Sequence, residues 1–188
     1  MITDLKINAE RKQFYYEKGY WTEKTLGDVW ADRVASHPER PYVSDDQGSS
    51  YTYGEIDDKA ARLAAWLVEQ GVAPGDVVTF QMPTWAEFCI VYVAALKAGA
   101  VMHPLPRNFN DADLVYGMNL VGSRAFICPT KVAKVDFESQ ILSIVDQIPT
   151  LGPVALVDKA APKHSELPTV AEICARYEPI EYPPPHHV

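Results

Sequence analysis

Hydrophobic residues in the middle of the chain follow two alternating periods. Between Thr52 and Gly71 they recur at helical spacing, and 86–98 is apolar on nearly every side, so both segments are predicted helices. Short apolar runs at 76–81 and 100–105, bounded by proline or glycine, are typical of buried strands. This alternation predicts βαβ units and therefore an α/β fold, a doubly wound and mostly parallel sheet with helices on both faces.

The two central helices carry the same start and stop signals. Thr52 and Thr84 are each followed three residues later by glutamate, the pattern of a capping box that satisfies backbone N–H groups at a helix start. Gly71 and Gly99 each follow the last periodic residue, where a helix commonly ends in a left-handed conformation. We therefore expect well-defined boundaries for both helices.

The remaining segments continue the alternation of helices and strands. A small hairpin is predicted around the turn 45–48, and the aromatic arm 14–21 is expected to form a short helix and a lid whose rings pack on the body. Residues 1–24 are thus an arm, 25–176 an α/β unit, and 177–188 a proline-rich linker or end. Further predicted elements are a helix capped by Thr25, a helix capped by Asn110, strands at 124–128 and 153–157, a helix at 136–147, and a last helix at 167–176 with Pro168 in its first turn.

Size and charge narrow the classes of function. The chain has 188 residues, of which 47% are hydrophobic, which is enough for the core of one domain. A net charge of −8 without clustered lysine and arginine argues against nucleic acid as a partner. The sequence contains neither a signal peptide nor an apolar run of the roughly 18 residues that would cross a membrane, so no integral membrane segment is predicted and the cytoplasm is the expected location.

The cysteines and histidines do not form a metal-binding pattern. Cys89, Cys128 and Cys174 are far apart in the sequence and make no Cys-x-x-Cys pair, so we expect buried, reduced thiols. His186 and His187 are adjacent, but they close a proline-rich tail and are expected to be solvated. No metal site is therefore predicted.

The sequence has no nucleophile elbow, phosphate-binding P-loop, dinucleotide fingerprint or zinc-protease motif, so catalytic residues are not predicted. Three residues near the ends of predicted strands are candidates for contact with a ligand. Arg107 either pairs with a phosphate through its guanidinium or forms a surface salt bridge. His103 is either a hydrogen-bonded structural imidazole or a base, and Trp85 either packs on the helix start or lines a pocket.

Two long segments carry a resemblance to a known family. They are SYTYGEIDDKAARLAAWLVEQGVAPGDVV at 50–78 and QMPTWAEFCIVYVAALKAGAVMHPLPR at 81–107. Together they resemble the N-terminal region of adenylate-forming acyl-CoA synthetases and related ligases, over about 25–157. The segment MPTWAEF and the aromatic arm are similar to those of short- and medium-chain members.

The resemblance implies a function for a longer parent protein. Members convert a carboxylate and ATP to an acyl-adenylate and then usually acylate coenzyme A, with Mg²⁺ as the metal. Their phosphate loop and mobile C-terminal domain would follow the end of this sequence, so we expect an N-terminal fragment that is inactive by itself. In benzoate-type relatives the arginine of the Pro-Leu-x-Arg motif approaches the coenzyme A nucleotide, and this implies the same contact for Arg107.

Three functions stay open from the sequence. The first is a fatty acyl-CoA synthetase for short or medium chains, and the second is an aryl-acid ligase of siderophore synthesis, of the dihydroxybenzoate type. The third is a binding or assembly module without catalysis. The expected partners are the rest of the polypeptide, with its phosphate-loop subdomain and C-terminal domain, and a small carboxylic acid. The sequence leaves open whether the protein forms a homodimer.

Overall fold

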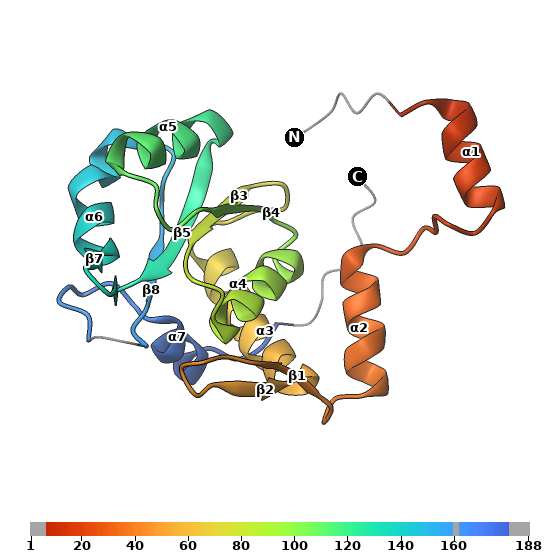
Figure 1. The fold of residues 1–188 in the computed structure, drawn as a ribbon, viewed down its shortest axis with the longest axis horizontal. Coiled ribbons are helices and arrows are strands. Elements are labelled where there is room, and N and C mark those ends of the chain that lie inside the picture. Colours follow the sequence, from red (N-terminus) through yellow and green to blue (C-terminus); the bar gives the residue numbers. More distant parts are fainter. Residues whose placement is uncertain (1–6, 160–161, 181–188) are drawn as a thin grey trace.

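The fold is organised around a four-stranded parallel sheet with the strand order β4-β3-β5-β8. In this computed structural model, residues 7–159 and 162–180 are described. The strands are β3 (Val77–Gln81), β4 (Val101–Leu105), β5 (Ser123–Pro129) and β8 (Val154–Val157). Figure 1 shows this sheet flanked by helices, so the predicted α/β fold class is confirmed.

The direction in which the chain adds strands to the sheet changes once, after β4. From β3 the chain passes through α4 (Ala86–Lys97) to β4 on one side, and then through α5 (Asp111–Val121) to β5 on the other side. In open α/β sheets a reversal of this kind leaves a crevice at the carboxyl ends of the strands where the order changes, and ligands bind there. The topology therefore directs attention to the carboxyl ends of β3, β4 and β5.

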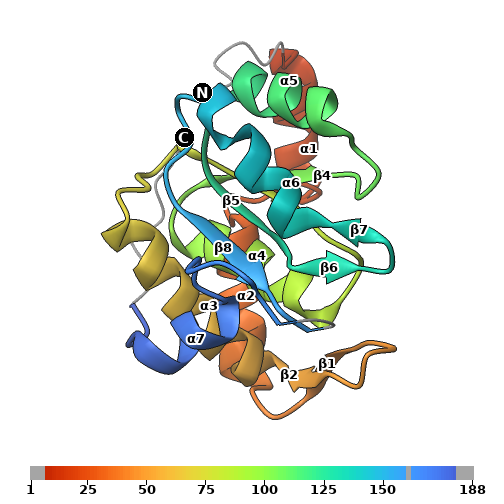
Figure 2. The same cartoon turned by 90° about the vertical axis from the view of Figure 1, so that its left-hand side faces the viewer.

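Helices cover both faces of the sheet, and each face has its own apolar core. On one face Val78, Phe80 and Ile127 pack with α3 (Tyr53–Glu69), α4 and the short α7 (Val170–Arg176). On the other face Phe126 packs with α5 and with α6 (Phe137–Ile144), which continues as the 3₁₀ helix Val145–Gln147. Figure 2 shows α5 and α6 on one side of β5 and β8, with α3 and α7 on the other.

The N-terminal segments differ in how closely they pack on the larger core. Helix α2 (Leu26–Ser36) contributes Trp30 to the larger core, and the antiparallel strands β1 (Pro41–Ser44) and β2 (Ser50–Thr52) form the predicted hairpin. Helix α1 (Ala9–Glu17) has no buried residue, and it stands apart from the sheet in Figure 1. Its aromatic rings pack on one another, with the Tyr15 and Trp21 centroids 4.9 Å apart. The predicted helix is confirmed, but these ring pairs form within the arm, where the sequence predicted packing on the body.

Two local predictions need correction. The N-cap of α4 is Trp85, and the predicted capping box of Thr84 is not formed; Asp45 accepts the N–H of Ala86 there. Pro168 precedes α7, which begins after the capping residue Thr169. The structure also contains a second hairpin that the sequence did not predict, formed by β6 (Lys131–Val132) and β7 (Val135–Asp136) ahead of α6.

Candidate functional site

The candidate site lies at the carboxyl edge of the sheet, where β3 and β4 end next to each other. Gln81 and Leu105 are paired in register as the last residues of the two strands, and the chain then turns through Pro106 and Arg107 toward α5. Sequence analysis placed Arg107 at the end of a strand, and the structure confirms this location.

Gln81 holds this turn in place from the neighbouring strand. Its side chain is 1% exposed, and Nε2 donates a hydrogen bond of 2.9 Å to the carbonyl of Pro106, the residue before Arg107. Its other polar atom, Oε1, is buried and accepts no hydrogen bond from the described residues. A buried amide with one firm hydrogen bond to the backbone restricts the conformations of the turn. Sequence reasoning noted Gln81 only as the end of a strand.

Arg107 itself is exposed to solvent. Within the described part of the chain its guanidinium forms no hydrogen bond or ion pair, so the predicted alternative of a surface salt bridge has no partner there. A guanidinium offers a rigid fork of donors that suits phosphate and carboxylate groups. The residue is therefore available for an anion at the edge where the topology predicts a ligand.

His103 is part of the sheet and serves a structural role. It lies in β4, half-buried, with Nδ1 3.0 Å from Oγ1 of Thr79 on β3. Thr79 in turn contacts the hydroxyl of Ser123 on β5, so a polar line crosses three strands. Burial lowers the pKa of His103, which favours the neutral imidazole. These contacts agree with the structural alternative of the two that the sequence left open.

Trp85 lies next to a buried ionic cluster that the sequence did not reveal. Its side chain is 6% exposed, and Nζ of Lys159 lies 5.6 Å from its ring centroid. Lys159 pairs with Asp45, which follows β1, and with Glu87 of α4 at 3.0 Å. Burial opposes the charges of Lys159 and Asp45, but their hydrogen bonds outweigh it, so the pKa of Lys159 is raised and that of Asp45 is lowered. This cluster joins three segments that are distant in the sequence.

The cysteines give no sign of a reactive or metal site. All three are free, with Cys128 fully buried and Cys89 and Cys174 half-buried, so burial is less complete than predicted for two of them. Burial raises the pKa of each thiol, which keeps it protonated and unreactive. No group of three metal-ligating side chains occurs among residues 7–159 and 162–180, while His186 and His187 lie outside the described residues.

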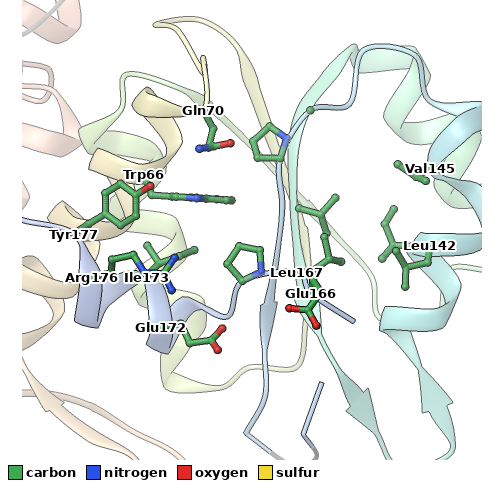
Figure 3. Close-up of a pocket in the computed structure, with 15 residues that line it drawn as sticks. Trp66, Gln70, Leu142, Val145, Glu166, Leu167, Glu172, Ile173, Arg176 and Tyr177 are labelled. Atoms are coloured by element: carbon green, nitrogen blue, oxygen red, sulfur yellow. The ribbon is translucent and has the colours of Figure 1, made fainter. Parts of the chain in front are cut away.

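A separate groove of about 600 Å³ runs along β8, between α3 and α7 on one side and α6 on the other (Figure 3). Its lining is largely apolar, with charged groups at the rim. Trp66, Leu142, Val145, Leu167, Ile173 and Tyr177 are among the lining residues. The residues come from four segments between 66 and 177, so no local sequence motif marks this groove.

The described residues do not fit a bound nucleotide and its metal ion. The sequence has no glycine-rich phosphate loop, and the described segments bring no three metal ligands together. Arg107 offers its donors to a single anionic group at this edge. No helix in the described part of the chain has the length and apolar character needed to cross a membrane.

Comparisons with known proteins point in one direction. A family model described as AMP-binding enzyme matches residues 30–187. The medium-chain fatty-acid–CoA ligase of Escherichia coli is 36% identical over 167 residues, which cover 89% of this chain and 30% of that protein. The salicyl-AMP ligase / salicyl-S-ArCP synthetase of Mycobacterium tuberculosis is 28% identical, again over 89% of this chain and 30% of that protein.

A solved structure is similar over nearly the whole chain. The apo structure of Mycobacterium smegmatis MbtA has a TM-score of 0.77 at 28% sequence identity, covering 95% of this chain and 32% of that chain. The chain therefore spans about a third of the length of these three relatives.

Proposed function

The chain belongs to the family of AMP-binding enzymes, and from this premise we propose that it is the N-terminal part of an AMP-forming acyl-CoA ligase for a short- or medium-chain fatty acid. The observation that carries the proposal is the 36% identity to a medium-chain fatty-acid–CoA ligase over 89% of this chain. In this proposal a carboxylate reacts with ATP in the presence of Mg²⁺, pyrophosphate leaves, and the acyl group passes to coenzyme A.

The proposed role of the 188 residues is to support a site whose main ligands come from elsewhere in the protein. Two observations support this division of roles. The relatives are about three times as long as the matched region, and the residues described here do not fit ATP with its metal ion. The rigid sheet supplies a fixed edge, and nucleotide and acid contacts are assigned to the rest of the polypeptide.

Arg107 is the residue that we propose for direct contact with coenzyme A. Its exposed guanidinium suits a phosphate of the coenzyme, and Gln81 holds the preceding residue in position. We expect Arg107→Ala in the full-length protein to raise the KM for coenzyme A about tenfold, the effect of losing one charge-assisted hydrogen bond, and to leave adenylate formation unchanged. Arg40→Ala is the matched control, because Arg40 is an exposed arginine at the start of the hairpin. An unchanged KM in the Arg107 variant would remove this assignment.

A panel of acids tests the proposed substrate class. ATP–pyrophosphate exchange by the full-length protein reports adenylate formation separately from transfer to coenzyme A. We expect exchange with fatty acids of short or medium length and little with salicylate or 2,3-dihydroxybenzoate. Exchange that is strongest with the aryl acids would contradict the fatty-acid assignment while keeping the adenylate-forming chemistry.

An aryl-acid AMP ligase is the second candidate. The similarity to the salicyl-AMP ligase at 28% identity and the TM-score of 0.77 to the MbtA structure favour it. Its acyl acceptor would be a carrier protein in place of coenzyme A. A protein that shows no exchange with any acid would instead support the third candidate, a module without catalysis.

A further inference from the structure

A serine, a histidine and a glutamate meet at the carboxyl edge of the sheet, on the side away from Arg107. Glu138 and Ser139 lie in the first turn of α6, beyond the end of β5. His164 lies in the segment between β8 and α7. Both segments follow the carboxyl ends of parallel strands, which is where α/β proteins place ligands. The proposed ligase function uses none of these residues.

The three side chains have the geometry of an activated nucleophile. Oγ of Ser139 lies 3.1 Å from Nε2 of His164, and Nδ1 of His164 lies 3.2 Å from Oε2 of Glu138. The nearby Glu138 carboxylate favours the tautomer with hydrogen on Nδ1, in which Nε2 accepts a hydrogen bond from the hydroxyl of Ser139. A nucleophile within reach of a base, which a third group orients, is the arrangement expected for covalent catalysis.

The three residues differ in burial: Glu138 is buried, whereas Ser139 and His164 are accessible to solvent. Glu138 is 0% exposed, and it accepts hydrogen bonds from the backbone N–H groups of His164 and Ser165, the latter at 2.8 Å. Ser139 is exposed, and the His164 side chain is 53% exposed. Oδ1 of Asp136 lies 3.9 Å from Nε2 of His164. A substrate can therefore reach the serine while the carboxylate stays fixed.

The apolar groove of Figure 3 is lined in part by residues that are close in sequence to Ser139 and His164. Leu142 lies about one turn beyond Ser139 on α6, and Glu166 and Leu167 follow His164 by two and three residues. All three residues line the groove of about 600 Å³. This volume accommodates the acyl chain of a small lipid-like ester.

We propose that Ser139 is an acyl-accepting nucleophile with His164 as its general base, acting on activated esters whose apolar acyl chain lies in the groove. The Ser139 hydroxyl attacks the ester carbonyl while its proton passes to Nε2 of His164. The imidazolium then protonates the leaving alkoxide or phenolate, which gives a seryl ester. Water hydrolyses that ester through the same base and releases the carboxylic acid. Glu138 is a positioning residue that holds the ring and its tautomer.

The local backbone limits the substrates to activated esters. Early N–H groups of α6 are already engaged, with that of Ser139 donating to Asp136 and that of Glu138 donating to the carbonyl of Thr130. They are therefore not available to stabilise the oxyanion of the tetrahedral intermediate. We expect turnover of nitrophenyl esters and none of amides.

The test uses the full-length protein without ATP or coenzyme A, and 4-nitrophenyl hexanoate as the probe. We expect Ser139→Ala and His164→Gln each to lower nitrophenolate release about 100-fold, the scale of general base catalysis. Ser143→Ala is the matched control, because Ser143 is an exposed serine of the same helix whose hydroxyl donates to the carbonyl of Gln140. Glu138→Gln is expected to lower kcat with KM unchanged, where kcat is taken per active site titrated with a fluorophosphonate, so that a loss of folded protein does not account for the fall.

A fluorophosphonate label provides a second measurement that does not depend on turnover. Mass spectrometry is expected to find the adduct on Ser139 and to find it lost in His164→Gln. Equal ester hydrolysis by wild type, Ser139→Ala and Ser143→Ala, or a label on a different serine only, would overturn the proposal. Equal rates with the acetate and hexanoate esters would overturn the assignment of the groove. Pyrophosphate exchange is expected to be unchanged in Ser139→Ala, so this result and that of the proposed ligase function are separable.

Discussion

At the scale of single residues, Asp45 connects more of the molecule than any local feature of its sequence suggests. Its carboxylate accepts backbone N–H groups from Gln47 and Ser49 in the hairpin turn and from Ala86 at the start of α4, and it pairs with Lys159 beyond β8. The side chain is 3% exposed, so these partners replace water almost completely. One buried carboxylate thus ties the hairpin to α4 and to the segment that follows β8.

Asp45→Asn is expected to lower the free energy of unfolding by about 2 kcal/mol at pH 7, because Lys159 loses one of its two carboxylate partners. Chemical denaturation measures this change. Asp46→Asn is the matched control, because Asp46 is exposed and accepts a hydrogen bond from the neighbouring Gln47 side chain. Equal stabilities of the two variants would show that the ionic cluster does not stabilise the fold.

The lowered pKa of Asp45 also predicts a dependence on pH. The unfolded carboxyl titrates near its ordinary pKa of about 3.9, and the folded one titrates below it. The stabilisation is therefore complete above about pH 5 and is lost as the pH falls through the folded pKa. We expect the free energy of unfolding of wild type to fall more steeply than that of Asp45→Asn between about pH 5 and 2. Parallel pH curves would contradict this linkage.

At the scale of elements, the helix starts show that the same sequence pattern can have two outcomes. Thr52 forms a complete capping box with Glu55 at the start of α3. Thr84 has the same spacing to Glu87, but α4 begins one residue later and Glu87 pairs with Lys159. The difference arises because Asp45 reaches the N-terminus of α4 from the hairpin and satisfies the N–H of Ala86.

Alanine at these two threonines separates the two outcomes. Thr52→Ala is expected to destabilise the protein by about 1 kcal/mol, the usual effect of losing an N-cap side chain. Thr84→Ala is expected to change stability by less than about 0.5 kcal/mol, because Thr84 is exposed and caps nothing. Denaturation of both variants under one condition checks the difference, and a larger loss for Thr84→Ala would reverse our assignment of the cap.

The helix ends offer a matched pair of glycines. Gly71 and Gly99 both have positive φ, at 87° and 68°. An added Cβ at Gly71 meets nothing within 4 Å, whereas at Gly99 it lies 3.2 Å from Cβ of Pro74. We expect Gly71→Ala to cost about 1 kcal/mol from the left-handed conformation alone, and Gly99→Ala to cost more because Pro74 must also move. The melting temperatures of the two variants show which substitution is more destabilising. An equal decrease in melting temperature would show that Pro74 moves at no measurable cost.

At the scale of the whole molecule, the sheet presents two candidate sites on one edge. The turn that carries Arg107 follows β4, and the Ser139–His164–Glu138 cluster follows β5 and β8, so the sites are at opposite ends of the strand order. The chain covers about a third of its relatives, so the ligase proposal requires residues that lie beyond those described here.

The 188-residue chain by itself is expected to show no ATP–pyrophosphate exchange with any fatty acid, whereas the full-length protein exchanges. The physical reason is that the described residues fit one anionic group and not a nucleotide with its metal ion. A circular dichroism spectrum typical of mixed helix and strand is the control that the chain is folded. Exchange by the isolated chain would show that its own residues form a complete site.

Much of the fold could be predicted from the sequence, because its helices and strands follow from local patterns of residues. The four parallel strands and the helices of the central region follow from hydrophobic period and glycine stops, and the caps at Thr25, Thr52 and Asn110 formed as predicted. The hairpin of β6 and β7 was missed because each strand has two residues, too few to show a period. Of the candidate site, only Arg107, His103 and Trp85 were recognised, since they adjoin predicted strand ends.

The sequence by itself determined the order of the elements, because helix and strand periods, caps and turns depend on neighbours within a few residues. Tertiary structure alone decided which distant groups meet. The pairing of Asp45 with Lys159 joins residues 114 positions apart, and His164 lies 25 positions from Ser139. Such contacts depend on how the strands are ordered in the sheet and which loops share its carboxyl edge, and no local period records that order.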